Sequence, residues 1–520
     1  MKTPSTRRQF LSQVGQGMIV ATVGHEVSSE MGMADVRAAE AVKPLNFGEL
    51  EPLVGLMQET PAAKLLPALN AKLKAGVTLR QLTAAGALAN ARTFGGEDYI
   101  GFHTMMALSP ALHMSGEMPD GQRALPVFKV LYRNTNRIQE RGGRSAEVLH
   151  QVAEESASTR HDSQTLRAAV HQKDVAAAEK AFASLARTGA ADAFNHLLHT
   201  VQDNTEVHRV VLPYRAWDLQ GIIGSEHAHT LLRQSVRYCV RAESRTASAT
   251  WNEPRTLLPK LMDQHKLLGR ELGTRAMDDA WVEQFSSTLF KASPTQAAEA
   301  AAAALAEGIA PAAVGEAISL AANQLCLRDL GRPPSQESAG KPVGSVHGDS
   351  IGVHACDSAN AWRNMARVSN ARNTFACLIL GAYQMALDRG QRGGDFLNWQ
   401  PLPVQWQLDQ VKATSQADLL REAEDAIRQN LQARTAAIVH RYGELKLPAR
   451  PVFDLMLRYA VSEDGALHAE KFYRTTVEEF AAARAPFRWR LLVALGRVTA
   501  SEFGRPAPGM DEARALIKAA

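Results

Sequence analysis

The stretch DYIGFH, residues 98–103, occurs a second time as DSIGVH, residues 349–354. Asp, Ile, Gly and His recur at the same positions, and each copy ends in a histidine. The match runs on without a gap to RGG at 141–143, which pairs with RGG at 392–394. Self-similarity at a fixed spacing is the sequence signature of an internally repeated architecture. The chain is therefore predicted to be a duplicated unit.

The similarity between the two halves extends to both sides of this block. Upstream, LKAGVTLRQLTAAGALA from Leu73 aligns with LAEGIAPAAVGEAISLA from Leu305. The offset changes because the second copy contains an insertion, for which the Pro- and Gly-rich GRPPSQESAGKPVG at 331–344 supplies most of the residues as a loop. Downstream the copies diverge, but His208 still aligns with His468.

Composition and periodicity predict an all-α fold. Aromatic residues make up only 6% of the 520 residues, and alanine is abundant, which favours helices over sheets. Apolar residues recur three and four apart at 60–76, where Gly76 is a natural helix end, and at 420–445. We predict two duplicated helical units, residues 42–290 and 291–520, packed with pseudo-twofold symmetry.

The N-terminus has the pattern of an export signal. STRRQFL, residues 5–11, contains the paired arginines, the spacer and the Phe-Leu of a twin-arginine motif, and AEA ending at Ala41 fits a cleavage site. We predict that residues 1–41 are a twin-arginine signal peptide, that the export machinery is a partner and that the mature protein is periplasmic. A basic, frayed N-terminus is the alternative. Proteins exported by this route resemble cofactor-loaded cargo, which favours a metal.

Other features disfavour several classes of function. The net charge is only +4 and the basic residues are spread along the chain, unlike the concentrated basic face of a nucleic-acid-binding protein. No segment after the signal has the ~18 apolar residues that a membrane span needs. The sequence contains no CxxC, HExxH, GxSxG or P-loop. The four cysteines allow two disulfides or isolated buried thiols: Cys239, Cys326, Cys356 and Cys377.

The repeated histidines are the candidate functional residues. When two copies pack about a twofold axis, equivalent residues approach that axis, so their imidazoles would converge. Neutral imidazole is a good ligand for iron, copper and zinc, and Asp98 and Asp349 could hold the second ring nitrogens. The alternative is that each histidine caps or packs the same helix junction in both copies. The predicted metal ligands are His103, His354, His208 and His468, with His229 as a weaker candidate.

Two further patterns could contribute metal ligands. His196 and His199 are three apart, so they would lie on one helical face. Glu-x-x-His occurs at 147–150 and at 226–229, and this is the spacing that di-iron carboxylate bundles use. Neither pattern falls on a duplicated position, so both remain secondary alternatives.

Four islands of the chain resemble a known group of proteins: IGFHTMMALSPAL, EHAHTLLR, VHACDSANAWR and LHAEKFYRTTVEEF. They look like a family of exported bacterial helical proteins of unassigned function and, more distantly, like the questin-oxidase-like enzymes. The latter resemblance implies a mononuclear non-haem iron held by histidines and a modified lysine, and oxidative opening of polycyclic aromatic rings. It implies His354 and His103 as the best iron ligands. Lys129 and Lys471 lie near the islands, but neither is duplicated, so a lysine ligand has no match.

We therefore expect a periplasmic metal-dependent oxidoreductase, specifically a non-haem iron oxygenase with a multi-histidine site between its two halves. The cofactor would be a transition metal, with Fe(II) favoured over Cu or Zn. The partner would be a small-molecule substrate, aromatic if the resemblance holds, with neither nucleic acid nor a membrane span. The alternative is a non-catalytic exported binding or scaffold protein with structural histidines.

Overall fold

The computed structural model describes most of the chain, namely residues 43–153, 161–244, 252–339, 341–348, 350–391 and 394–518. The predicted signal peptide at 1–41 therefore lies outside the described residues, as do Asp349 and part of the RGG at 392–394. Residues Pro44–Ala520 form one compact unit. Every regular element among the described residues is a helix, which confirms the predicted all-α class.

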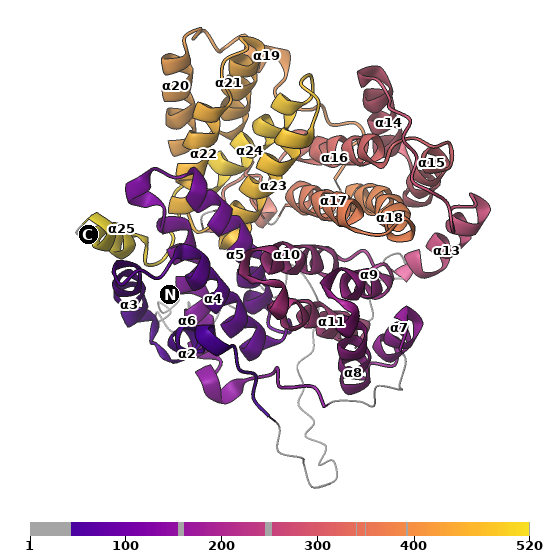
Figure 1. The fold of residues 1–520 in the computed structure, drawn as a ribbon. Helices are drawn as coiled ribbons and strands as arrows, with labels where there is room; N and C mark the ends of the chain where they lie inside the picture. The colour runs from indigo at the N-terminus through magenta and orange to yellow at the C-terminus, as the bar shows by residue number, and fades with distance from the viewer. Residues whose placement is uncertain are drawn as a thin grey trace, which may run out of the picture. The chain divides into compact units, whose positions relative to one another are not determined.

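The first half of the chain contributes α2 to α13 (Figure 1). Their bounds are α2 (Glu51–Glu59), α3 (Ala62–Lys74), α4 (Leu79–Phe94), α5 (Tyr99–Glu117), α6 (Leu125–Glu140), α7 (Ser163–His171), α8 (Val175–Leu185), α9 (Ala190–Val201), α10 (Val207–Ile223), α11 (Ala228–Ser244) and α13 (Pro254–Gln264). Short 3-10 turns lie between them at η1 (Gly48–Leu50), η2 (Asp120–Gln122), η3 (Gly143–Ala146), η4 (Ala186–Thr188) and η5 (Ser225–His227).

The second half contributes α14 to α25. Their bounds are α14 (Asp279–Lys291), α15 (Pro294–Ala306), α16 (Pro311–Arg328), α17 (Ile351–Val368), α18 (Ala371–Gly390), α19 (Gln405–Leu408), α20 (Gln416–Arg428), α21 (Gln432–Glu444), α22 (Arg450–Ser462), α23 (His468–Ala482), α24 (Arg488–Glu502) and α25 (Met510–Lys518). The 3-10 turns are η6 (Pro334–Gln336) and η8 (Gly465–Leu467).

The two copies of the repeated hexapeptide start the helices α5 and α17. Asp98 caps α5 by accepting a hydrogen bond from the Gly101 N–H at 2.8 Å, and Ser350 caps α17 by accepting one from the Val353 N–H. Such side-chain acceptors satisfy amides that the first helical turn leaves unpaired. Both repeated histidines consequently lie near the N-termini of buried helices.

The structure agrees with the helix end predicted from the sequence in one segment and shows an unpredicted break in another. The helix predicted at 60–76 ends at Lys74, and Gly76 follows with a left-handed φ of 91°, the conformation that glycine adopts at low cost. The periodic segment 420–445 is broken into α20 and α21, because Asn430 is left-handed with φ of 54°. Buried residues three and four apart occur on both sides of the break, among them Ala423 and Ile427 in α20 and Ile438 and Tyr442 in α21.

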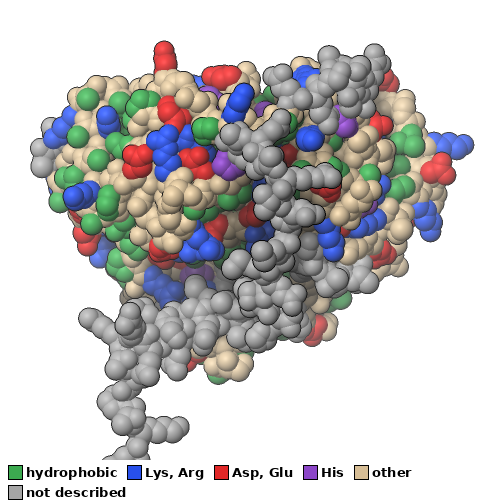
Figure 2. All heavy atoms as spheres, turned by 90° about the horizontal axis from the view of Figure 1, so that it is seen from below, with side chains coloured by type: hydrophobic (Ala, Val, Ile, Leu, Met, Phe, Trp, Pro, Cys, Tyr) green, Lys and Arg blue, Asp and Glu red, His purple; other side chains and the backbone are tan. Residues whose placement is uncertain are grey.

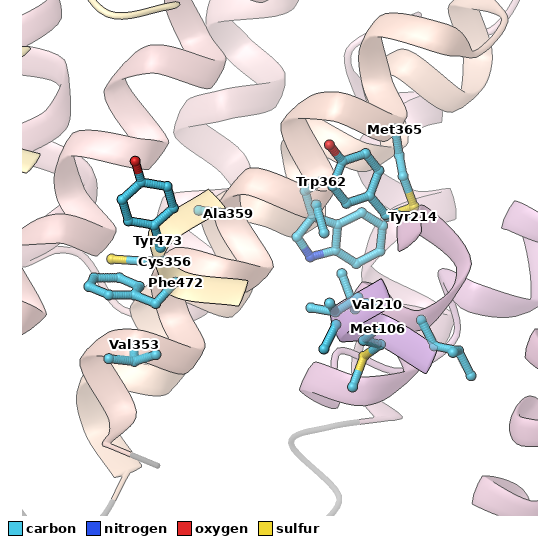
Figure 3. Close-up of a cluster of buried hydrophobic side chains, with 14 of the residues drawn as sticks. Met106, Val210, Tyr214, Val353, Cys356, Ala359, Trp362, Met365, Phe472 and Tyr473 are labelled. Atoms are coloured by element: carbon cyan, nitrogen blue, oxygen red, sulfur yellow. The ribbon is translucent and has the colours of Figure 1, made fainter. Parts of the chain in front are cut away.

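Four helices from distant parts of the chain meet in the interior. α5 packs against α10 and α23, and α17 packs against the same two helices. Figure 3 shows apolar side chains of these helices in the interior, among them Met106, Val210, Trp362 and Phe472, all of which are buried. At the periphery, α13 packs against α15 and α18, whereas α25 packs against α3 and α6.

The surface and the thiols bear on the remaining expectations. No helix of the described part of the chain is both long and apolar enough to cross a bilayer. Acidic and basic side chains are interspersed over the coloured part of the face in Figure 2. The four cysteines are free and buried, although the sulfur atoms of Cys326 and Cys356 lie 3.8 Å apart.

Candidate functional site

Four histidines gather where α5, α10, α17 and α23 meet. The ring centroids of His103 and His208 lie 4.8 Å apart, and those of His354 and His468 lie 5.4 Å apart. The two pairs adjoin each other, with 5.2 Å between His103 and His468 and 6.3 Å between His208 and His354. These are the four histidines that the alignment of the two halves of the sequence singled out.

Within each pair the Nε2 atoms face each other. The Nε2 atoms of His103 and His208 are 3.3 Å apart, and those of His354 and His468 are also 3.3 Å apart. Two nitrogens bound to one tetrahedral ion with metal–nitrogen bonds near 2.0–2.1 Å lie roughly 3.3 Å apart. The spacing within each pair therefore fits two ligands of one ion.

His103 has its second nitrogen fixed by the backbone. Its Nδ1 lies 2.7 Å from the carbonyl oxygen of Tyr99, and a carbonyl oxygen can only accept, so Nδ1 carries the proton. Burial, together with the nearby charge of Lys471 and of the neighbouring imidazoles, holds the pKa of His103 well below its usual value. His103 is therefore neutral, with the lone pair on Nε2.

His208 is oriented by a carboxylate two residues before it. The Nδ1 of His208 lies 2.6 Å from Oε1 of Glu206, and the Tyr238 hydroxyl donates to Oε2 at 2.7 Å. Burial alone raises the pKa of Glu206, but the His208 imidazole and the hydrogen bonds from His208 and Tyr238 outweigh it and lower the pKa to about 2. The ionised carboxylate accepts the Nδ1 proton, so a neutral His208 also carries its lone pair on Nε2.

The contact between His103 and His208 therefore needs a cation. With both Nδ1 atoms protonated, two neutral rings would direct lone pairs at each other across 3.3 Å. A proton, which converts one ring to imidazolium, or a metal ion removes that repulsion. The low pKa of His103 disfavours the proton on that ring.

His468 is held by a strained backbone. Gly465, Ala466 and Leu467 all have left-handed φ angles, of 50°, 48° and 66°, and His468 follows as the first residue of α23. Left-handed conformations cost non-glycine residues of order 1–3 kcal/mol and are found where the surrounding structure imposes them. Leu467 is buried at 1% exposure, so packing of its side chain holds the turn that places His468.

Aromatic rings line the first histidine pair. Phe102 lies 5.0 Å from the ring of His103 and 4.9 Å from that of His208. The ring of Tyr99 lies 4.4 Å from His103, while the residue is 58% exposed. The site is thus walled by apolar rings and lies one side chain below the surface at Tyr99.

A buried lysine, Lys471, acts on His103 and interacts with the buried carboxylate of Asp357. Burial lowers the pKa of Lys471 to about 8, against the opposing charges of Asp357 and Glu470. Burial raises the pKa of Asp357, and the Thr475 hydroxyl donates to its carboxylate at 2.8 Å. Lys471 is within electrostatic range of His103. A lysine with this pKa can hold or release a proton near neutral pH.

A short buried connection ends at Glu206, two residues before His208. It runs from Gln202 to Glu206 between α9 and α10, and Gln202, Asp203, Asn204 and Thr205 are all buried. The Asn204 side chain accepts a hydrogen bond from the Glu206 N–H at 2.8 Å. Its backbone is therefore fixed, and so is the carboxylate that orients His208.

Asp98 does not hold a histidine, contrary to the sequence-based hypothesis. Its carboxylate caps α5 and accepts from Arg137 and Arg141 at 2.7–2.9 Å. The backbone carbonyl of Tyr99 takes the role expected of Asp98. Lys129 is likewise engaged elsewhere, with carbonyl oxygens of Ala460 and Glu463 and the carboxylate of Glu470.

The weaker histidine candidates lie apart from the four. His229 stacks on Phe182 at 5.6 Å, and its described ring contacts include none of the four histidines. His196 contacts the Ser163 hydroxyl at 2.7 Å.

The two Glu-x-x-His motifs are engaged in different contacts. Glu147 pairs with Arg92 at 2.9 Å, and the side chain of Glu226 is 70% exposed beside His227. No described contact joins the two motifs.

Sequence reasoning missed Glu206 as the residue that orients His208. Its position as an N-cap two residues before a histidine that aligns with His468 is a signal that could have found it. Lys471 was considered only through the resemblance, and its burial beside His103 could not be inferred from spacing.

Four imidazole nitrogens suit a transition metal such as iron, copper or zinc. The four rings are not arranged around a single point, however. In the described part of the chain, no group of three or more His, Cys, Asp or Glu side chains is already arranged to hold an ion. The four imidazoles form two pairs instead. Comparisons with protein-family models, curated proteins and solved structures find no match, so the functional argument rests on the chemistry of the site.

Proposed function

We propose that the protein is a periplasmic metal-dependent oxidoreductase, specifically a non-haem iron oxygenase. His103, His208, His354 and His468 would hold the ion between helices α5, α10, α17 and α23. The observation that carries the proposal is the 3.3 Å approach of Nε2 of His103 to Nε2 of His208, with each Nδ1 already donating its proton elsewhere.

The surroundings of the histidines support a resident ion. Glu206 and the Tyr99 carbonyl fix the tautomer and direction of the rings, as outer-shell partners do in metal sites. Adjacent rings of the two pairs have centroids 5.2 and 6.3 Å apart, so the four imidazoles form one cluster. Four neutral imidazoles leave a divalent charge uncompensated, and the ionised Glu206 reduces it.

Residues of this chain would do the remaining work. A bound ferrous ion would supply the electron transfer to dioxygen that side chains cannot perform. Phe102 and Tyr99 exclude water from one side of the pair and offer rings against which an aromatic substrate can pack. Lys471 would accept or return a proton beside the site.

We infer that the site arose by duplication of one helical unit. The order of helices supports this: α3 to α6 correspond to α15 to α18, and α9 to α11 correspond to α22 to α24. The packing of α13 on the second half and of α25 on the first half is reciprocal, as a twofold relation requires. The units expected from the sequence are 42–290 and 291–520. The helix α14 (Asp279–Lys291) ends at this boundary and packs on α16 and α18 of the second half.

The second candidate is a non-catalytic exported binding or scaffold protein with structural histidines. The separation of the imidazoles into two pairs favours it, because a proton shared within each pair would satisfy the rings without an ion. In that case the cluster would stabilise a helix junction and nothing more.

Metal analysis of protein purified with its native export signal distinguishes the two. The oxygenase proposal expects close to one transition-metal ion per chain, an apo form that gains thermal stability with Fe(II), Cu(II) or Zn(II), and dioxygen uptake with an aromatic substrate in the iron form. If none of the three ions changes the melting temperature of the apo protein, the oxygenase proposal is rejected in favour of the scaffold protein.

A further inference from the structure

A second candidate site is a cavity lined by residues outside the histidine cluster. It has a volume of about 270 Å³ and is lined by residues of α7, α9, α13 and α18 and of the connection after α9. Small-molecule sites are concave, mostly apolar, and contain a few convergent polar groups. This cavity has both kinds of wall.

The polar wall carries three guanidinium groups. Arg167 is paired with Asp203 at 2.5 Å, and Arg255 is paired with Glu243 at 2.6 Å. Arg372 differs, because no carboxylate of the described residues lies within ion-pair distance of it. It donates instead to the side-chain oxygens of Gln202 and Asn373.

Burial lowers the pKa of Arg372, as expected of a guanidinium partly removed from water. The charge of Arg372 acts in turn on His199: burial first and Arg372 second lower the pKa of His199 to about 3, so His199 is neutral. Burial is the largest cause of both shifts. The positive charge left uncompensated in the cavity is that of Arg372, for which the described residues supply no carboxylate within ion-pair distance. An anion there would compensate it.

The cavity also has apolar lining residues. Leu258 and Met262 of α13 line it, together with Leu268, whose side chain is 62% exposed. An exposed leucine beside arginines is suited to a ligand with an apolar body and a charged head. An inorganic anion has no apolar body and would therefore leave these apolar side chains in contact with water.

We propose that the cavity binds a small organic anion, whose carboxylate or phosphate is held by Arg372 and whose apolar body packs on α13. Planar guanidinium groups bind both oxyanions in a bidentate manner. The proposal does not depend on the oxidoreductase function, because it concerns a different set of residues.

Calorimetric titration of the full mature chain with benzoate, hexanoate and phenyl phosphate tests it, with benzamide as the uncharged analogue and inorganic phosphate as the anion without an apolar body. At least one organic anion should bind at millimolar concentration or below, more tightly than benzamide and inorganic phosphate. Which of the carboxylates or the phosphate ester binds identifies the head group. Absence of binding by all three organic anions, or equal binding of benzamide, would overturn the proposal.

Two variants localise the binding. Arg372→Gln should weaken it about tenfold or more, the size expected for loss of a charged hydrogen-bonding partner, whereas Arg389→Gln, also partly buried and on α18, should not. Leu268→Glu alters an exposed residue and should weaken binding by repulsion, whereas Leu272→Glu should not. Unchanged affinity in both Arg372→Gln and Leu268→Glu would reject the site.

Discussion

Nε2 of His103 lies 3.3 Å from Nε2 of His208, although the Nδ1 proton of each ring is already donated to another oxygen. Two such nitrogens are compatible only with a cation between them. The identity of that cation separates an enzyme from a structural junction, and the predictions below address it from several sides.

The first prediction concerns metal content. His103→Ala and His354→Ala should each lower the bound metal, because each removes one imidazole from the cluster. His150→Ala and His440→Ala should retain wild-type content, since neither ring is described in contact with the cluster. Elemental analysis of the four purified variants is the measurement. Equal content in all four would reject the site.

The second prediction concerns the orienting carboxylate. Glu206→Gln keeps an oxygen that can accept from the Arg209 N–H at the helix start but removes the charge against Nδ1 of His208. Metal affinity should fall about 10- to 100-fold, as for other outer-shell partners. Glu226→Gln, an exposed change beside His227, is the control. Competition with a chelator measures the metal affinity of the two variants. Equal affinities of Glu206→Gln and Glu226→Gln would show that Glu206 does not act through His208.

The third prediction concerns strain before His468. Ala466→Gly should raise the free energy of unfolding by about 0.5–1 kcal/mol, because glycine adopts φ of 48° without a Cβ clash. Ala303→Gly within α15 should instead lower it by a similar amount. Urea denaturation of the two variants gives the comparison. Destabilisation by both changes would mean that the turn is not strained.

The fourth prediction concerns pH. The pKa of His199 is about 3 in the folded protein and 6.5 in the unfolded chain. As the pH falls, the unfolded chain therefore binds a proton at this residue before the folded protein does. The stabilising contribution is full above 6.5 and is lost progressively toward 3. The groups that face His199 are His196, Arg167, Arg372 and, with opposite sign, Asp203.

Denaturation curves measured at several pH values check this assignment. Wild type should lose stability more steeply than His199→Gln between pH 6.5 and about 4, whereas the two proteins should show parallel pH dependence above pH 7.5. Identical slopes over the acidic range would show that His199 titrates normally in the folded protein.

The fifth prediction concerns a buried ion pair. Lys129 and Glu470 lie 2.5 Å apart with side-chain exposures of 2% and 0%. Lys129→Met should cost about 3–5 kcal/mol of unfolding free energy by leaving a buried carboxylate unpaired. The double variant Lys129→Met, Glu470→Met should recover a large part of that loss in urea denaturation. A double variant no more stable than the single one would mean that the carboxylate is not the cause.

The sequence predicted the helical class and singled out four histidines that lie together. The repeated hexapeptide made this possible, because histidines that recur in it, such as His103 and His354, stand out without knowledge of the packing. The all-helical class followed from alanine content and the apolar period. Metal binding, export and the position of the unit boundary stay predictions.

Other parts of the site depend on packing between distant segments. Tyr99 holds His103 through a backbone carbonyl, which no side-chain pattern indicates. The sequence suggested Asp98 as the partner of His103. In the structure, Arg137 of α6 and Arg141, just after the end of α6, donate hydrogen bonds to the Asp98 carboxylate instead. The second cavity joins Arg167, Arg255 and Arg372, and nothing in their local sequence relates one to another.

The connection from Gln202 to Glu206 has one further consequence. Gln202 and Asp203 line the second cavity, whereas Glu206, at the other end of the same five residues, orients His208. An occupant that tightens this segment would change the affinity of the histidines for their cation. By thermodynamic reciprocity, the cation would then change the affinity for the occupant by the same factor. The binding of either ligand would therefore depend on whether the other, chemically unrelated one is bound.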